Sequence, residues 1–176
     1  MNTHWTYIII SIISILTMPC FAQEFKDGSV FFFKDGYLAR PIQNHTGSTI
    51  THTAILLYDD EPYVYEAIFP RVRRVPLNEY LDFIRSMQSR LIPSRRCASW
   101  FVVNPNLTEE QLSKAKLYAN SQLGTKYMMK GFWKNKTVQG IHCSQFVSET
   151  LNIAGLPIDY GPKVAPVDIY RQLNNE

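Results

Sequence analysis

Short apolar runs, rich in Val, Ile, Phe and Tyr and separated by turn-forming residues, occupy much of the chain between residues 29 and 103. Runs of this length and composition predict β-strands, which we place at 29–33, 51–58, 62–69, 72–75 and 98–103. Asp59 and Asp60 separate the second run from the third, so these two strands form a predicted antiparallel hairpin. The polar stretch 41–50 predicts a surface loop.

Apolar residues recur at helical spacing in the later part of the chain. This pattern predicts helices at 77–87, from the capping box 108–111 to about residue 122, from Cys143 to the stop at Gly155, and at 167–173. Because strands come first and helices dominate later, we expect an α+β fold in which an antiparallel sheet packs against helices.

Residues 1–22 are typical of a signal peptide rather than of a folded domain. The apolar run 7–16 is too short to span a bilayer, and a small-x-small cleavage site ends at Ala22. We therefore expect cleavage after Ala22, export to the periplasm or the medium, and a single domain over 23–176, where no repeat or linker interrupts the sequence. A membrane-anchored form, acylated at Cys20 or uncleaved, is the less favoured alternative.

The composition is that of a globular protein, since 45% of the 176 residues are hydrophobic. The formal net charge is +3, and the basic residues form no dense stripe. This pattern argues against a nucleic-acid-binding protein, whereas proximity to a membrane surface or to the cell wall stays open. The sequence does not determine the oligomeric state.

Cys143 is the candidate nucleophile because it begins a predicted helix. Free backbone N–H groups and the positive end of the helix dipole favour the thiolate form of a cysteine at this position. Cys97 is the only other cysteine that remains after the predicted cleavage. In an oxidising compartment, a disulfide between Cys97 and Cys143 is the alternative interpretation, and it would prevent nucleophilic attack.

His52 and Glu66 are the candidate base and orienting group, one in each strand of the predicted hairpin. If Leu57 pairs with Glu61, His52 lies directly opposite Glu66 on the same face, whereas a slip of one residue separates them. A thiolate nucleophile, an imidazole base and a carboxylate that fixes the imidazole tautomer together perform acyl transfer. The amide N–H of Cys143 is a candidate oxyanion donor.

Four short segments follow one another along the chain: Ser48-Thr49-Ile50-Thr51-His52-Thr53-Ala54-Ile55, Val64-Tyr65-Glu66-Ala67, Gly124-Thr125-Lys126-Tyr127 and His142-Cys143-Ser144-Gln145-Phe146-Val147. Their order and spacing resemble those of the YiiX-like proteins, which are circularly permuted, papain-fold members of the NlpC-like cysteine peptidase superfamily. The resemblance implies a circularly permuted papain-like (NlpC-like) fold. It also implies a thiol hydrolase or acyltransferase with His52, Glu66 and Cys143 as catalytic residues.

Three residues near the nucleophile are candidates for substrate binding. Tyr127 and Met128 belong to an apolar run that either fills the core or forms the wall of a cleft. His142 directly precedes Cys143, where the related proteins commonly carry an aromatic residue. Because neighbours in sequence align their side chains poorly, we expect His142 at the rim of the site rather than as the base.

The sequence thus predicts an exported cysteine hydrolase that cleaves an amide or ester bond in a cell-wall peptide or a lipid-linked amide. One alternative is a thiol acyltransferase of the lecithin–retinol type, which commonly has a second histidine where Glu66 stands. The other is a binding module that holds a lipid, an amine or a peptide in a papain-like cleft without turnover. No metal or other cofactor is predicted, because His45, His52, His142 and Cys143 lack a compact ligand spacing.

Overall fold

The computed structural model of the protein describes residues 25–35, 39–88, 99–129 and 139–175. The predicted signal peptide at 1–22 and Cys97 lie outside these residues. Within the described ranges, no helix has the length and apolar character needed to cross a membrane.

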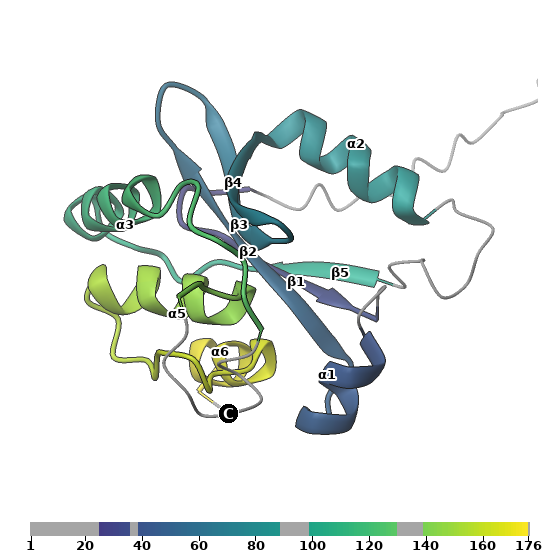
Figure 1. Cartoon of the computed structure of the whole chain (residues 1–176). Coiled ribbons are helices and arrows are strands. Elements are labelled where there is room, and N and C mark those ends of the chain that lie inside the picture. The colour runs from purple at the N-terminus through teal and green to yellow at the C-terminus, as the bar shows by residue number, and fades with distance from the viewer. Residues whose placement is uncertain (1–24, 36–38, 89–98, 130–138, 176) are drawn as a thin grey trace, which may run out of the picture.

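Five strands form one antiparallel sheet in the order β4-β3-β2-β1-β5 (Figure 1). The strands are β1 (Val30–Lys34), β2 (Ile50–Tyr58), β3 (Pro62–Ile68), β4 (Arg71–Pro76) and β5 (Ser99–Val103). Each of them agrees with a predicted strand to within one residue at either end. The short apolar runs therefore located the sheet correctly, and the predicted hairpin is the pair β2–β3.

The helices of the described residues are α1 (Ala39–Thr46), α2 (Leu77–Gln88), α3 (Glu109–Ser121), α5 (Cys143–Ile153) and α6 (Pro166–Leu173). All of these except α1 confirm a predicted helix. α3 begins with the predicted capping box, in which the Thr108 hydroxyl accepts from the Gln111 N–H and the Gln111 side chain accepts from the Thr108 N–H.

The prediction of a surface loop over 41–50 was wrong, because α1 occupies most of this stretch. The helix is short and buries little, so its polar residues dominate the sequence pattern. Ile42 is its buried contact, with 5% of its surface exposed. Pro41 lies in the first turn, where a missing N–H costs no helical hydrogen bond. Gly47, with a φ of 66°, ends the helix.

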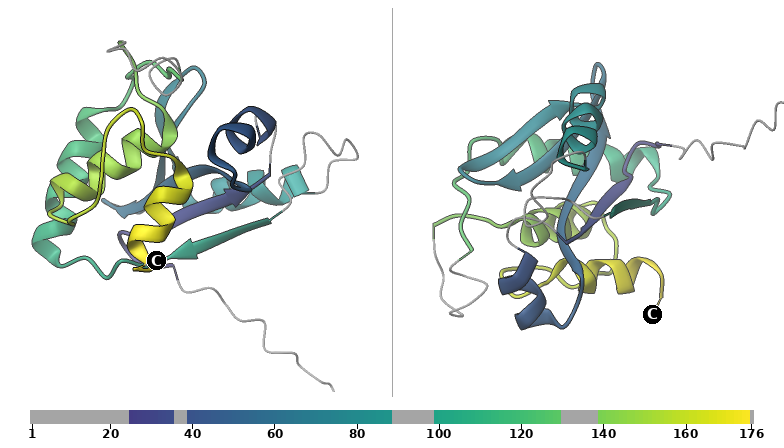
Figure 2. Two further views of the ribbon diagram at one scale, coloured as in Figure 1. Left: turned by 90° about the horizontal axis from the view of Figure 1, so that it is seen from below. Right: turned by 90° about the vertical axis from the view of Figure 1, so that its right-hand side faces the viewer.

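Helices cover both faces of the sheet (Figures 1 and 2). α3, α5 and α6 lie together on one face and form the larger apolar core with it, whereas α2 packs on the other face. This arrangement confirms the predicted α+β fold with an antiparallel sheet packed against helices.

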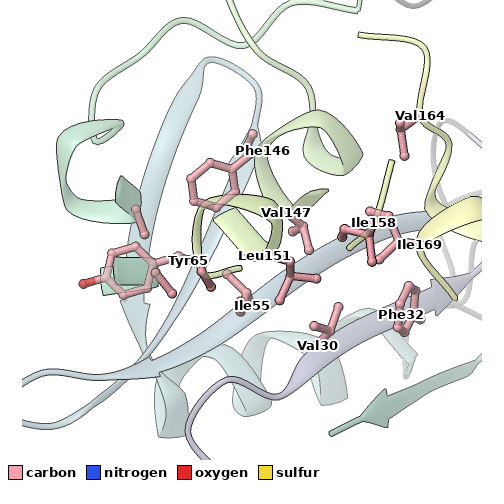
Figure 3. Packing of buried hydrophobic residues seen from close by; sticks show 14 of the residues in the cluster. Val30, Phe32, Ile55, Tyr65, Phe146, Val147, Leu151, Ile158, Val164 and Ile169 are labelled. Atoms are coloured by element: carbon pink, nitrogen blue, oxygen red, sulfur yellow. The ribbon is translucent and has the colours of Figure 1, made fainter. Parts of the chain in front are cut away.

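The larger core fixes the position of α5. Figure 3 shows Phe146, Val147 and Leu151 of α5 directed toward the sheet, where Val30 and Ile55 meet them. All five side chains are fully buried. Burying a side chain of this size contributes about 1.5–3 kcal/mol, so the helix is held firmly against the sheet. The first residue of α5 is therefore held in a defined place beside the sheet.

Candidate active site

Cys143 is the first residue of α5, and a glycine turn sets its position. Gly140 precedes it with a φ of 143°. A Cβ atom added at Gly140 would lie 2.5 Å from Cβ of Met128 and 2.7 Å from the carbonyl oxygen of Lys126, so only glycine fits there. This close approach lets Ile141 donate to the Lys126 carbonyl and accept from the Met128 N–H. The segment that carries Tyr127 is thereby fixed beside the nucleophile.

His142 is the N-cap of α5 and does not lie at the rim of the site, as we had expected. Only 2% of its surface is exposed. Its Nδ1 accepts from the Gln145 N–H at 3.3 Å, and its Nε2 donates to the Pro162 carbonyl at 3.0 Å. A ring nitrogen that accepts from the backbone satisfies a free N–H of the first helical turn. The correction follows from this capping role, which draws the side chain inward.

The hairpin brings His52 and Glu66 together, although by a register that differs from the predicted one. Leu57 pairs with Tyr63 rather than with Glu61, and continuing this ladder places Ile68 opposite His52, with Glu66 two residues before it. A shift of two residues keeps both side chains on the same face. Diagonal neighbours of this kind lie within reach of long side chains. His52 Nε2 accordingly lies 2.8 Å from Oε2 of Glu66.

Two residues that the sequence analysis missed hold the Glu66 carboxylate. Arg73 donates to Oε1 from Nε at 2.9 Å and from Nη2 at 2.6 Å, and the Tyr80 hydroxyl donates to Oε2 at 3.0 Å. Arg73 lies directly opposite Glu66 in the β3–β4 ladder. The register of this second hairpin would have revealed Arg73 from the sequence, but Tyr80 comes from α2 and only the tertiary fold places it here.

These contacts keep Glu66 ionised inside the protein. Its side chain is only 2% exposed, and burial by itself would raise the pKa of the carboxyl. The hydrogen bond from His52 and the charges of His52 and Arg73 outweigh burial, so the pKa of Glu66 lies below its usual value. A buried carboxylate in this state fixes the orientation of the imidazole and stabilises its protonated form.

His52 also contacts the Cys143 thiol. Since Nε2 is bound to Glu66, the nitrogen that faces the sulfur is Nδ1. Burial alone would lower the pKa of His52, but the Cys143 thiolate and then Glu66 raise it to about 10. Burial alone would raise the pKa of Cys143, but the charge of His52 and hydrogen bonding with His142 and His52 lower it to about 5. At neutral pH the pair is therefore a thiolate and an imidazolium.

A shift in the sheet explains how one side chain reaches both partners. The ladder between β1 and β2 changes register beside His52. As a result Ile50 and Ile55 both lie in the larger core, although regular alternation over five positions would place them on opposite faces. From this point the imidazole meets Glu66 on the α2 side of the sheet and Cys143 at the start of α5.

A pocket of about 670 Å³ opens beside His52. Aromatic and aliphatic side chains dominate its lining, which comprises Phe33, Ile42, Ile68, Phe69, Phe83, Ile84, Met87, Met129, Tyr80, Tyr127, Thr51, Asp35, His52 and Glu66. Cys143 is 4% exposed and does not line the pocket. Of the pair formed by His52 and Cys143, only His52 therefore lines the pocket, and Tyr127 lines it as well. A lining of this composition suits an apolar chain.

Of the residues expected to bind substrate, Tyr127 lines the pocket, whereas Met128 and His142 do not. Tyr127 lines the pocket and lies close enough to Cys143 that burial and then the thiolate charge raise the pKa of its hydroxyl above the usual value. Met128 does not line the pocket but packs against Gly140, and the next residue, Met129, takes the place that we had expected for it. The apolar run therefore contributes Tyr127 and Met129, but not Met128, to the lining of the pocket.

Cys143 has a free thiol. Cys97, its predicted alternative partner, lies outside the described residues. His45 is in the last turn of α1 and does not line the pocket beside His52. Among the residues that the structure describes, no three His, Cys, Asp or Glu side chains are grouped so that they could hold a metal ion.

Comparisons with known proteins support the family and the fold. A family model described as a permuted papain-like amidase enzyme, YaeF/YiiX, of the C92 family matches residues 24–160. Among solved structures, the crystal structure of the metalloprotein yiiX from Escherichia coli O157:H7 matches with a TM-score of 0.56 at 24% sequence identity. The match covers 74% of this chain and 66% of that one, so the chain spans just under two thirds of the length of that protein. Among the curated proteins no match was found.

The word metalloprotein applies to that relative, and the described residues of this chain do not fit a metal in the same region. Both ring nitrogens of His142 have protein partners, and Nε2 of His52 is bound to Glu66. Among the described residues, Cys143 belongs to no group of three His, Cys, Asp or Glu side chains that could hold a metal ion, so it has fewer potential ligands around it than a protein zinc site requires.

Proposed function

Because the chain belongs to the C92 family of permuted papain-like amidases, a branch of the cysteine hydrolases, we propose that it cleaves an amide or ester bond through Cys143, His52 and Glu66. The observation that carries this proposal is the contact of one imidazole with both a thiol and a buried carboxylate. Such an arrangement provides a nucleophile, an acid–base group and an orienting group in one place.

In the first half of the proposed reaction, the Cys143 thiolate attacks the carbonyl carbon of the substrate. A carbon–sulfur bond forms, and the carbonyl oxygen takes the negative charge. His52 then gives its Nδ1 proton to the leaving nitrogen, or to the oxygen of an ester, as the bond from carbon to the leaving group breaks. The products of this half are a thioester on Cys143 and a free amine or alcohol.

In the second half, neutral His52 takes a proton from a water molecule, and the oxygen of that water attacks the thioester. The carbon–sulfur bond breaks, a carboxylic acid leaves, and the thiolate–imidazolium pair is restored. Glu66 keeps Nε2 of His52 as a donor throughout, so that Nδ1 remains the nitrogen that exchanges the proton.

Two groups are placed to stabilise the oxyanion of each tetrahedral intermediate. The N–H of Cys143 lies at the start of α5, where the helix dipole favours negative charge. The Tyr127 hydroxyl lies in the pocket near the sulfur, and its raised pKa keeps it protonated and able to donate. Buried donors of this kind each contribute about 3–4 kcal/mol to the transition state in well-studied hydrolases.

The lining of the pocket favours a lipid-linked amide over a cell-wall peptide. A peptide would require several hydrogen-bonding groups, whereas aromatic and aliphatic side chains line most of the cavity beside His52. We propose that the acyl part of the substrate lies in this pocket, with its carbonyl carbon at the end bordered by His52 and Tyr127.

A hydrolysis assay tests the proposal. The protein is incubated with amides of one amine that carry either a dodecanoyl or an acetyl group, and with a short peptide, and the released amine is measured. We expect the dodecanoyl amide to give the highest kcat/KM. Cys143→Ser and His52→Ala should each lose activity by about a thousandfold or more.

Cys97→Ser is the matched control, because it alters the other cysteine of the predicted mature chain and should retain activity. Full activity of Cys143→Ser would show that the reaction does not use this thiol. Preference for the peptide would overturn the assignment of the acyl group while leaving the hydrolase mechanism intact.

A further inference from the structure

The apolar lining of the pocket continues outward onto the surface. Phe69, at the turn between β3 and β4, lines the pocket and is 79% exposed. Phe83 on α2 also lines the pocket and is 41% exposed. A large aromatic side chain in water gains from insertion into the interfacial region of a bilayer. The two rings thus form an apolar rim at the opening of an apolar pocket.

Two basic residues adjoin this rim. Arg71 directly follows the turn that carries Phe69, and it pairs with Lys126 in an antiparallel bridge. The Tyr127 N–H donates to the Pro70 carbonyl at 2.9 Å, which ties the Lys126 segment to the same turn. Both Arg71 and Lys126 are exposed. Like charges directly opposite each other in strand pairing repel, and an anion that contacts both relieves this repulsion.

Arg71 and Lys126 differ in their ion pairing from the other two arginines of β4. Arg73 and Arg74 are neutralised by Glu66 and Asp59, respectively. Within the described residues, no ion pair engages Arg71 or Lys126. The rim therefore combines exposed aromatic rings with positive charge that no ion pair balances within the part of the chain that the structure describes.

We propose that Phe69, Phe83, Arg71 and Lys126, which we call the mouth face, bind an anionic lipid surface. Aromatic side chains enter the interface while basic side chains contact the anionic headgroups, and each basic residue near such a surface raises the affinity about fivefold. The pocket then opens toward the bilayer, and an acyl chain passes into it without crossing water. This last step rests on the proposed function, whereas the binding of the surface does not.

Vesicle flotation tests the proposal with the full chain. The vesicles contain phosphatidylcholine alone or with phosphatidylglycerol, an anionic lipid. We expect binding to require phosphatidylglycerol. Binding should also weaken as the salt concentration of the assay is raised from about 50 to about 500 mM, because added ions screen exposed charges. The double variant Arg71→Glu, Lys126→Glu should bind at least 25-fold more weakly, from about fivefold at each residue. Phe69→Ser should also weaken binding.

Two matched controls lie elsewhere on the surface. Leu117→Ser alters a side chain that is 72% exposed on α3, and Lys163→Glu alters an exposed basic residue after α5. Neither should change the binding. Because the predicted signal peptide is present in every variant, its contribution cancels from the comparison. Equal binding of the double variant and the unaltered protein, or an equal loss in the controls, would overturn the proposal.

A second measurement separates this proposal from the catalytic one. Cys143→Ala should bind the vesicles as the unaltered protein does, because the mouth face does not include the thiol. The double variant Arg71→Glu, Lys126→Glu should hydrolyse a soluble acetyl amide at the normal rate. Loss of vesicle binding with normal hydrolysis assigns the effect to the mouth face. Absence of amide hydrolysis by the unaltered protein, with normal vesicle binding, would count against the proposed reaction alone.

Discussion

At the scale of single residues, the pairing of Cys143 with His52 has the largest chemical consequence. Cys143 is buried and His52 is partly buried, and each stabilises the charged form of the other more than burial opposes it. The thiolate therefore forms without a substrate, and His52 carries the proton that the leaving group will need. The charged state of each group depends on the other, so changing Cys143 or His52 should alter the titration of its partner.

The first prediction concerns the reactivity of Cys143 toward iodoacetamide as a function of pH. Because the pKa of Cys143 is lowered to about 5, alkylation should stay fast as the pH falls from 8 to 6 and should decline only near 5. In His52→Ala the largest lowering cause is gone while burial and the smaller contribution of His142 remain, so the alkylation pKa should rise toward the ordinary thiol value of about 8.5. Mass spectrometry of the alkylated peptide provides the rates.

The pKa values of Cys143 and His52 also set the pH range over which the protein should hydrolyse its substrate. kcat/KM should rise as Cys143 loses its proton near pH 5 and fall as His52 loses its proton near pH 10. A single alkylation pKa close to 8.5 in the unaltered protein would contradict the thiolate–imidazolium pair.

The second prediction concerns Arg73, which positions Glu66 without touching the reactive atoms. Arg73→Met removes two hydrogen bonds from a carboxylate that is nearly inaccessible to water, and we expect a loss of about 1–3 kcal/mol in the free energy of unfolding. Because Glu66 would no longer be held from both sides, kcat should fall more than KM changes. Urea denaturation and steady-state kinetics measure the two effects.

Arg73→Lys is the informative companion variant. Lysine restores the charge but not the paired donors, so it should recover stability more fully than kcat. Arg85→Met is the control, because Arg85 belongs to an ion pair in which both side chains are at least 70% exposed. Unchanged kcat in Arg73→Met would limit Arg73 to a structural role.

At the scale of elements, the nucleophile depends on the contact between the segment before α5 and the segment around Tyr127. The backbone pairing of Ile141 with residues 126–128 requires an approach that only Gly140 allows. The fixed position of α5 against the sheet then aligns Cys143 with His52. The candidate oxyanion donors come from both sides of this contact.

The third prediction is that Gly140→Ala damages the site. The added methyl group would meet Cβ of Met128 at 2.5 Å and a backbone oxygen at 2.7 Å, so the two segments must separate. We expect a loss of about 2–4 kcal/mol in the free energy of unfolding, as for other backbone strain in a packed region. kcat should fall at least tenfold because Tyr127 moves away from the sulfur.

Gly124→Ala is the matched control. Gly124 also has a positive φ, of 84°, but a methyl group there would have no other atom within 4 Å. Its cost should be limited to about 1–2 kcal/mol of backbone strain, with little change in kcat. Equal effects of the two variants on kcat would contradict the role of the close approach.

At the scale of the whole molecule, the chain belongs to a permuted papain-like family. The order of its elements determines which parts of the chain carry the candidate site residues. The hairpin with the histidine and the glutamate precedes the helix with the cysteine in the sequence. α2 then covers the face of the sheet on which the pocket lies, while α3, α5 and α6 cover the other face.

The fourth prediction concerns export of the whole chain. If residues 1–22 are a signal peptide, N-terminal sequencing of the protein recovered from the periplasm or the medium should give Gln23 as the first residue. Ala22→Arg, which places a large charged residue at the cleavage site, should leave the segment attached. Recovery of the unprocessed chain from the cytoplasm would contradict export.

The sequence by itself determined the properties that depend on local pattern. Apolar runs and helical spacing located every strand of the sheet and four helices, since burial on one side imposes a fixed period on the chain. The same alternation placed His52 and Glu66 on one face of the sheet. They do lie on one face, because the predicted register was wrong by two residues and a shift of two keeps both side chains on the same side. The order of motifs also identified the family correctly.

Only the tertiary structure decided the properties that depend on how elements meet. The hairpin register, the shift at His52 and the short helix α1 follow from turn closure and packing, which no local period records. His142 became a helix cap rather than a rim residue because the chain folds Pro162 onto it. Tyr80 and the pocket arise where α2 crosses the sheet, so the chain has to fold before those side chains become neighbours.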